Sequence, residues 1–475
     1  MCHFGIARCD ITPPVGIYHR MWGAATHDQA TGIHRSLYAT ALIFQCSPEA
    51  SQEQRQVFVT LDHCLLWSSE MEQLLATIER QTGIPSANIV VTFSHTHAAG
   101  LMGMERTELP GGSHIPNYLT WMANEISNIV IKAIECIQPV TITYGTGHCQ
   151  LAAHRDFWDE TNQQYVCGFN PEGPTDSTVV VARVTAEDDK PVAILVNYAC
   201  HPTTLAWANT LISPDFPGAT REVIEQVTGT LSVFLQGTSG DLGPQEGYVG
   251  DPNVADKNGR QLGYAALATL ESMLPPGTNY HYSHPVISGA TLGAWTHQPL
   301  EESERIDKSI WHQKLWTIEL PYHENLPTQE SVLMEQEKWS SWEREAQESG
   351  NEKREKECRA MVERTTRQLT RLRPLPSGTT FPLPVWMLRL GDAFWIFVHG
   401  EPYHIFQENL RKRFPDQVLV ISSLANGSVL GYLPTRETYG KGIYQELISI
   451  VSEGSLEQVI DAVAGAIDAC IHETR

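Results

Sequence analysis

The sequence lacks the marks of several protein classes. Its 475 residues contain no apolar run approaching the ~18 that a membrane-spanning helix needs. The N-terminus shows neither the basic start nor the apolar stretch of a secretory signal. Lysine and arginine number 33 against 55 acidic residues, and a net charge of −22 disfavours nucleic acids and anionic membranes as partners. We therefore expect a cytoplasmic protein that acts on a small molecule, with no nucleic-acid or membrane partner.

Paired cysteines are also missing. The ten cysteines are scattered and form no Cys-x-x-Cys motif. In a chain of this length without an export signal, we expect them to be reduced and mostly buried as small apolar side chains.

Hydrophobic residues make up 41% of the chain and charged residues 19%, as in globular proteins. Apolar runs that predict strands alternate with amphipathic stretches that predict helices. Strands are expected at 39–44, 57–61, 89–93, 179–184, 192–196 and 231–235, and helices at 69–81, 118–137 and 251–274. This alternation favours an α/β fold of layered sheets and helices, with functional groups at strand ends.

Residues 301–372 differ from the rest in being dense in Glu, Lys, Arg and Gln. Residues 330–371 are predicted to form one long helix, or two joined near Gly350-Asn351. Such a helix is most often a solvated arm, and a lid or a subunit contact is the alternative. The pattern thus predicts a catalytic unit of 1–300 and 373–475, interrupted by a charged helical insertion at 301–372.

Three predicted strands end in residues that can bind metal. His95 and His97 follow the run at 89–93, His201 follows the run at 192–196, and Glu401 follows a run at 394–398. Alternation along a strand would place the two imidazoles of His95 and His97 on one face. An isolated His-x-His is more often a polar loop, but two histidines and a carboxylate form the donor set of a catalytic zinc site.

Other polar residues could take part in binding or catalysis. Arg155 could stabilise an oxyanion, with a surface arginine equally compatible with the sequence. Ser239 lies in a glycine-rich turn, but Asp241 replaces the last glycine of a nucleophile elbow. Tyr432 and Tyr444 flank a predicted loop; tyrosines usually belong to cores, with ligand binding or proton donation as the alternative.

Several motifs together resemble the neutral (non-lysosomal) ceramidases, zinc amidases that cleave the acyl chain from sphingoid bases. The resemblance covers most of the chain outside the charged insertion. The matching segments are Gly5–Pro13, Gly32–Tyr38, His95-Thr96-His97, His201-Pro202-Thr203, Gly400-Glu401, and the single residues Arg155, Tyr432 and Tyr444. The resemblance implies a layered catalytic domain like that of the family.

The resemblance also implies roles for individual residues. A Zn²⁺ ion would be bound by His95, His201, Glu401 and Tyr432. His97 would line the reaction centre, while Arg155 and Tyr444 would contact the substrate.

Two departures from the family pattern stand out. In Gly240-Asp241-Leu242-Gly243-Pro244-Gln245, Gly243 stands where the family carries a nucleophilic serine. The chain also ends about thirty residues past Tyr444, so we expect no C-terminal immunoglobulin-like domain. Both differences argue that the substrate and nucleophile have changed, while Gly243 keeps a place beside the substrate.

The resulting hypothesis is direct hydrolysis of an amide or ester bond in a small soluble substrate. Zinc-bound hydroxide, available near pH ~7, would attack the carbonyl. His97 would act as general base or acid, with Tyr444 or Asp241 as alternatives. A carbohydrate-directed hydrolase or deacetylase, and a metal-binding pseudo-enzyme without turnover, remain alternatives. The charged insertion is a candidate surface for homo-oligomerisation.

Overall fold

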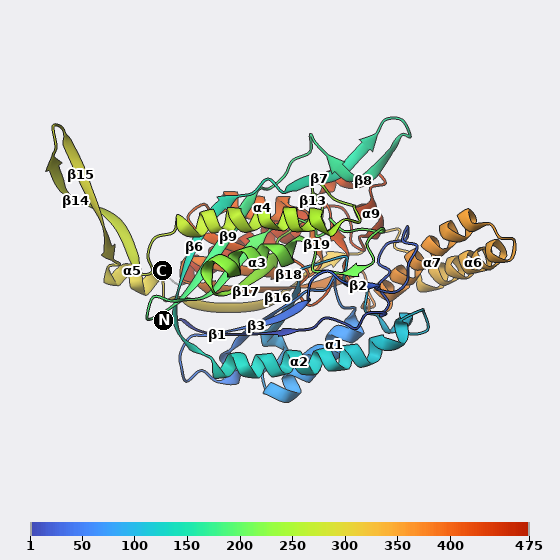
Figure 1. The fold of residues 1–475 in the computed structure, drawn as a ribbon, viewed down its shortest axis with the longest axis horizontal. Helices are drawn as coiled ribbons and strands as arrows, with labels where there is room; N and C mark the ends of the chain where they lie inside the picture. Colours follow the sequence, from blue (N-terminus) through green and yellow to red (C-terminus); the bar gives the residue numbers. More distant parts are fainter. Residues whose placement is uncertain (1, 474–475) are drawn as a thin grey trace.

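The computed structural model describes residues 2–473, and its largest element is a mixed sheet of eight strands (Figure 1). In spatial order these are β12 (Leu231–Gln236), β10 (Pro191–Tyr198), β9 (Thr178–Ala186), β6 (Gln138–His148), β1 (Cys2–Asp10), β3 (Tyr38–Gln45), β4 (Gln56–Leu61) and β5 (Ile89–Phe93). The sheet curls, because β12 at one edge contacts β4 and β5 at the other. Strand exits that are far apart in the sheet order are thereby brought together.

A second sheet packs face to face on the first. Its strands are β16 (Trp311–Pro321), β17 (Thr380–Leu390), β18 (Ala393–Val398) and β20 (Val418–Ser422). Aromatic side chains fill the interface: the rings of Phe58 and Phe397 stack with centroids 4.4 Å apart, and Phe44 lies 5.4 Å from Trp395. Every residue of β4, β5 and β18 is buried, as expected of strands covered on both faces.

Helices cover the outer faces of both sheets. On the eight-stranded sheet, α1 (Ser68–Thr82) and α2 (Ile115–Glu135) pack on one half, and α3 (Phe216–Thr228) and α4 (Pro252–Glu271) pack on the other. On the second sheet lie α8 (Ile405–Arg413) and α10 (Ser455–Glu473). The predicted α/β class with layered sheets and helices is confirmed, as a four-layer helix–sheet–sheet–helix arrangement.

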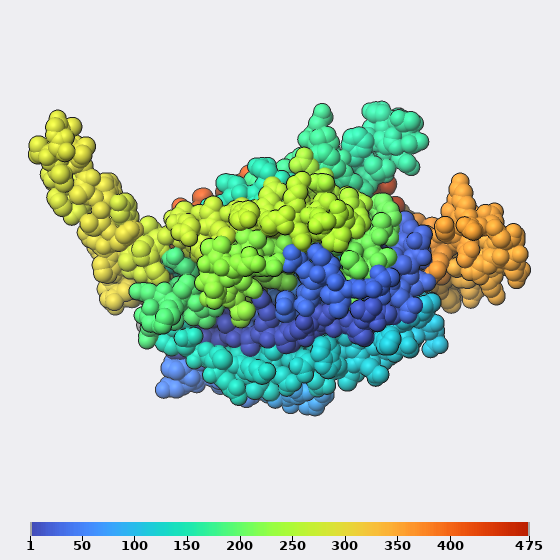
Figure 2. Space-filling model, viewed as in Figure 1, coloured from blue at the N-terminus to red at the C-terminus, as the bar shows by residue number. Residues whose placement is uncertain are grey.

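Three hairpins project from these layers (Figures 1 and 2). They are β7–β8 (Ala152–Asp159 and Gln164–Asn170), β14–β15 (Thr278–Ile287 and Thr291–Pro299) and α6–α7 (Gln329–Glu348 and Glu352–Leu372). The remaining short elements are β2 (Gly32–Ile33), β11 (Leu211–Ile212), β13 (Leu242–Pro244), β19 (Glu401–Pro402), β21 (Tyr432–Leu433), α5 (Glu302–Asp307), α9 (Tyr444–Ile448) and five short 3-10 turns.

The charged segment 301–372 is not helical throughout, which corrects the prediction. It contains α5, α6 and α7, but residues 311–321 form β16, paired along its length with β17. This strand was missed because polar residues interrupt its apolar ones and six of its eleven residues are exposed. Residues 330–371 form two helices and not one, which was one of the two predicted alternatives. The helices join at Gly350, whose φ is +66°.

None of the helices in residues 2–473 is long and apolar enough to cross a membrane.

A candidate metal centre and its cavity

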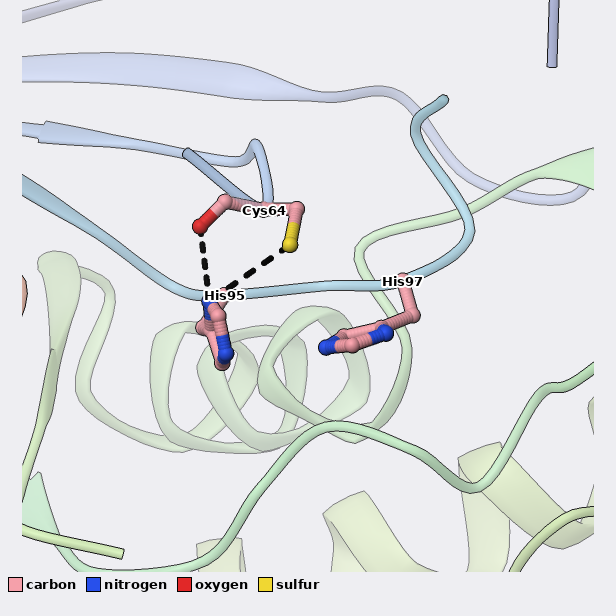
Figure 3. A group of neighbouring side chains, drawn as sticks. All are labelled: Cys64, His95 and His97. Atoms are coloured by element: carbon pink, nitrogen blue, oxygen red, sulfur yellow. Dashed lines mark hydrogen bonds between the residues drawn. The ribbon is translucent and has the colours of Figure 1, made fainter. Parts of the chain in front are cut away.

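His95 is held in a strained turn just beyond β5. The strand ends at Phe93, and His95 has a φ of +66°, so strand alternation does not continue to His97. The two rings nevertheless come together edge to face, with centroids 4.9 Å apart (Figure 3). The prediction that both imidazoles lie on one side is therefore correct, but its cause is a turn and not the strand.

The His95 ring is oriented by its Nδ1 atom. Nδ1 lies 2.7 Å from the backbone carbonyl oxygen of Cys64, in the loop after β4 (Figure 3). A carbonyl can only accept, so Nδ1 carries a proton and Nε2 is the atom left to bind a metal. His201, which follows β10, is fixed in the same way, because its Nδ1 donates to the carbonyl of Ser239 at 3.0 Å.

Glu401 completes a three-residue cluster. Gly400 precedes it with a φ of +84°, and a Cβ there would lie 2.8 Å from a Leu430 side-chain carbon, so glycine is required at this bend. The Oε1 atom of Glu401 accepts from the Ser428 hydroxyl at 3.1 Å. Its Oε2 atom is buried without a hydrogen-bond donor.

Three electron-pair donors therefore converge. The Nε2 atoms of His95 and His201 are 2.9 Å apart, and Oε2 of Glu401 lies 3.3 Å from the first and 3.4 Å from the second. Lone pairs this close repel unless a proton or a cation lies between them. Because two neutral imidazoles and a carboxylate are ligands that Zn²⁺ prefers, the donor set fits a zinc ion.

The charge states agree with this fit. Burial, together with the positive charges of Arg155 and His95, lowers the pKa of His201 well below its usual value. Burial opposes ionisation of Glu401, but the neighbouring His95 outweighs it and lowers the pKa of the carboxyl. At neutral pH, His201 is therefore an uncharged donor and Glu401 is an anion. Burial opposes protonation of His95, but Cys64 and Glu401 outweigh it and raise the pKa of His95 well above its usual value. A proton on His95 thus takes the place that a cation would take between the three atoms.

A second group of possible ligands, Cys64, His95 and His97, shares His95 with the first (Figure 3). Its thiol lies 3.6 Å from Nδ1 of His95, which already donates to the Cys64 carbonyl. This group therefore offers fewer free lone pairs than the His95–His201–Glu401 cluster.

His97 stands beside the cluster. Its Nε2 atom is buried without a hydrogen-bond partner, and its ring lies 5.2 Å from that of Trp22. It is thus positioned for proton chemistry rather than committed to a structural hydrogen bond.

Three further predicted residues line the same cavity. Arg155 donates to the Gly240 carbonyl at 2.6 Å, and its guanidinium lies 5.2 Å from the ring centroid of Tyr432. The Tyr432 ring lies 6.3 Å from His201 and 5.8 Å from Tyr444. Tyr444, at the start of α9, is 47% exposed and marks the cavity mouth.

Other predicted residues lie elsewhere. Both carboxylate oxygens of Asp241 are engaged by His404, through its Nδ1 atom at 2.6 Å and its backbone N–H at 2.8 Å. Gly243, in β13, does not line the cavity either, although a Cβ there would meet only the Thr203 hydroxyl, at 3.6 Å. The Ser239 hydroxyl accepts from Gln236 at 2.6 Å and faces the Nδ1 side of His201.

The cavity has a volume of about 490 Å³ and extends from the cluster to α7. Its apolar and aromatic wall includes Trp22, Leu65, Trp67, Leu101, Trp207, Tyr248, Leu326 and Ile448. The wall from α7 comprises Ala360, Glu363, Arg364, Arg367, Gln368, Arg371 and Leu372. Sequence reasoning missed both sets. The one available signal for α7 was the spacing of Arg364, Arg367 and Arg371, which are three and four residues apart.

The family model described as neutral/alkaline non-lysosomal ceramidase, N-terminal, matches residues 3–247. Neutral ceramidase B of Dictyostelium discoideum is 26% identical over 260 residues, which are 50% of this chain and 34% of the relative. Neutral ceramidase 2 of Arabidopsis thaliana is 24% identical over 227 residues, 46% of this chain and 29% of the relative.

The chain thus spans about a third of the length of these curated relatives. The crystal structure of neutral ceramidase from Pseudomonas aeruginosa superimposes with a TM-score of 0.64 at 16% identity, covering 98% of this chain and 73% of the other. At this identity, the match establishes the shared fold.

Proposed function

Because this chain belongs to the neutral/alkaline non-lysosomal ceramidase family, we propose that it is a zinc-dependent hydrolase of amide or ester bonds in small soluble molecules. The observation that carries the proposal is the convergence of His95 Nε2, His201 Nε2 and Glu401 Oε2 on one point beside a cavity. Membership alone leaves the substrate open, since the chain matches only part of its relatives.

His95, His201 and Glu401 would hold the ion, and Tyr432 is the candidate for a fourth contact. When bound, zinc supplies a Lewis acid and lowers the pKa of a coordinated water towards ~7. The chain's own contribution is to fix both imidazoles through backbone carbonyls, so that neither ring can rotate away.

Proton transfer falls to His97. Its free Nε2 atom would accept a proton from the attacking water and return it to the leaving group. Trp22 packs against the ring and keeps it at the cluster's edge.

Arg155 and Tyr444 would stabilise the negative charge that develops on the carbonyl oxygen of the substrate. Arg155 is buried and anchored at the Gly240 carbonyl, so its remaining N–H groups are preorganised donors. Tyr444, at the mouth, would supply a hydroxyl to the same oxygen or to the leaving group.

Water is the proposed nucleophile. Gly243 provides no hydroxyl, and the Ser239 hydroxyl is on the opposite side of His201 from the cluster. Neither of these two residues is therefore placed for covalent catalysis.

A carbohydrate-directed hydrolase or deacetylase is the second candidate. It is favoured by the aromatic group of Trp22, Trp207 and Tyr248, whose ring centroids lie 5.7–6.2 Å apart in the cavity wall. Sugar rings commonly pack on exposed aromatic faces, and Trp207 is 42% exposed.

Metal analysis combined with a substrate screen tests the proposal. The purified protein should contain about one zinc per chain and hydrolyse small amides or esters. Preferential cleavage of acetylated sugars would favour the second candidate. Stoichiometric zinc without turnover on any of these would instead favour a metal-binding pseudo-enzyme.

A further inference from the structure

One face of α7 carries three arginines into the cavity. Arg364, Arg367 and Arg371 are spaced three and four residues apart, so they lie along a single stripe of the helix. All three line the cavity that also contains His95 and Glu401.

The three arginines differ in their partners. Arg367 is held by Glu363, whose carboxylate is 2.8 Å away, and by the backbone carbonyl of Met21. Glu363 in turn receives a hydrogen bond from the fully buried Arg106 at 2.7 Å. This set fixes α7 against the body of the protein, and the single carboxylate of Glu363 is shared between Arg106 and Arg367.

Arg371 has no such partner. Among the residues that the structure describes, none forms a hydrogen bond or an ion pair with it, and its Nε atom is buried. Its guanidinium carbon lies 6.0 Å from the ring centroid of Trp67. Burial lowers the pKa of Arg371, since removal from water is the largest influence on it.

Such an arrangement costs free energy, because the guanidinium of the half-buried Arg371 is partly removed from water and no ion pair replaces the lost hydration. The chain as a whole carries a net charge of −22, yet this cavity is lined by four arginines (Arg155, Arg364, Arg367 and Arg371) against two glutamates (Glu363 and Glu401), with no lysine or aspartate. A metal ion at the cluster would make the cavity still more positive. The local charge therefore suits an anionic ligand.

We propose that Arg371 binds a carboxylate of the substrate, so that the enzyme acts on acyl compounds with a free carboxylate, such as N-acyl amino acids. This inference rests on the hydrolase function proposed above for the same cavity. The planar guanidinium matches a carboxylate through two parallel hydrogen bonds. Trp67, Leu65 and Leu101 provide an apolar wall for the hydrocarbon part. Arg364, exposed and without an ion pair among the described residues, would add attraction at the mouth.

The test measures binding without turnover. The ligands are 4-phenylbutanoate and 4-phenylbutan-1-ol, which share a hydrocarbon part and contain no scissile bond. Calorimetry on the purified full-length protein should give about tenfold or tighter affinity for the carboxylate, since a charge-assisted hydrogen bond contributes about 1.5–3 kcal/mol. Arg371→Gln should abolish the difference, and Arg371→Lys should retain part of it.

Arg373→Gln is the matched control. Arg373 caps the same helix, is exposed and lies outside the cavity lining, so its replacement removes the same charge without touching the site. Equal affinity of the wild type for the two ligands, failure to bind either, or an unchanged preference in Arg371→Gln would each overturn the inference. A preference lost equally in both glutamine variants would also overturn it, as a general charge effect. If Arg371→Gln does not fold, the proposal is still tested by the preference of the wild type for the carboxylate and by the partial loss of that preference in Arg371→Lys.

The two proposals fail separately. A protein that prefers the carboxylate but holds no zinc and hydrolyses nothing overturns the hydrolase proposal and leaves Arg371 as an anion site. A zinc hydrolase that is indifferent to the carboxylate overturns only the role of Arg371.

Discussion

The Nε2 atoms of His95 and His201 lie 2.9 Å apart, although the Nδ1 atom of each ring donates to a backbone carbonyl. Two imidazole nitrogens are thus held close together by residues 106 positions apart in the chain. The curl of the eight-stranded sheet makes this approach feasible, because it brings the exits of β5 and β10 together. A cation at this point would relieve the repulsion and join the two sheets through Glu401.

Zinc content is the first prediction. His201→Ala should reduce the metal from about one zinc per chain to a small fraction, because one of three converging donors is lost. Glu401→Gln should weaken binding less, since an amide oxygen still coordinates. Metal analysis after dialysis measures both. His281→Ala, an exposed histidine of β14, is the control and should change nothing. Full zinc occupancy in a His95/His201 double-alanine variant would end the assignment.

The second prediction separates His97 from the ligands. His97→Ala should keep its zinc and lose roughly 10²- to 10⁴-fold in hydrolytic rate, the usual contribution of a positioned acid or base. The variant's pH–rate profile should also lack one limb of the wild-type curve. A metal-free His97→Ala protein would instead show that His97 is a ligand, and proton transfer would then fall to Tyr444.

The third prediction concerns the nucleophile. Ser239→Ala should retain most of the activity, because its hydroxyl is engaged by Gln236 and lies on the Nδ1 side of His201. Rapid-quench mass spectrometry should detect no acyl-enzyme in the wild type. An acyl adduct on Ser239 would show that this serine performs covalent catalysis.

The fourth prediction treats Asp241 as a structural residue. Asp241→Asn should lower the free energy of unfolding by about 3–5 kcal/mol near pH 5, because it leaves the charge of buried His404 without its partner. Denaturant unfolding of both proteins at several pH values measures this difference.

The pH dependence of that difference follows from two pKa shifts. Burial raises the cost of ionising Asp241, but His404 outweighs it and lowers the pKa below 3.8; the stabilisation is therefore lost as pH falls through that lower value. Burial opposes protonation of His404, but Asp241 outweighs it and raises the pKa above 6.5; the stabilisation is therefore lost as pH rises through that higher value. The deficit should be largest between pH 3.8 and 6.5. A deficit independent of pH would contradict the ion pair.

The strand ends of the site could be predicted from sequence because buried strands are continuous apolar runs. β4, β5 and β18 are covered on both faces, and a polar residue directly after such a run is easily recognised. By contrast, β1 mixes His, Arg and Asp with apolar residues and is only half buried, so it carries no such signal. Gly5 in that strand reflects close contact with α2, where a Cβ would collide with the Ala133 carbonyl, and sequence does not reveal such a contact.

The cavity wall on α7 was beyond sequence reasoning for a different reason. Its inward face is polar, because it borders a cavity instead of an apolar core, and the usual hydrophobic stripe of a packed helix is therefore weak. A charged helix of this kind looks like a solvated arm. The left-handed turn at His95 was equally hidden, since no residue type there demands it.

The α6–α7 hairpin leaves and rejoins the second sheet at facing positions, because Pro321 at the end of β16 pairs with Thr380 at the start of β17. The whole hairpin is therefore an elongated connection between two adjacent antiparallel strands, and its length can change without altering either strand's register. His95, His201 and Glu401 follow β5, β10 and β18, so separate segments of the chain carry this cluster and the α7 wall of the cavity. A change in the length or sequence of the hairpin would therefore alter one wall of the cavity and leave the three converging side chains in place.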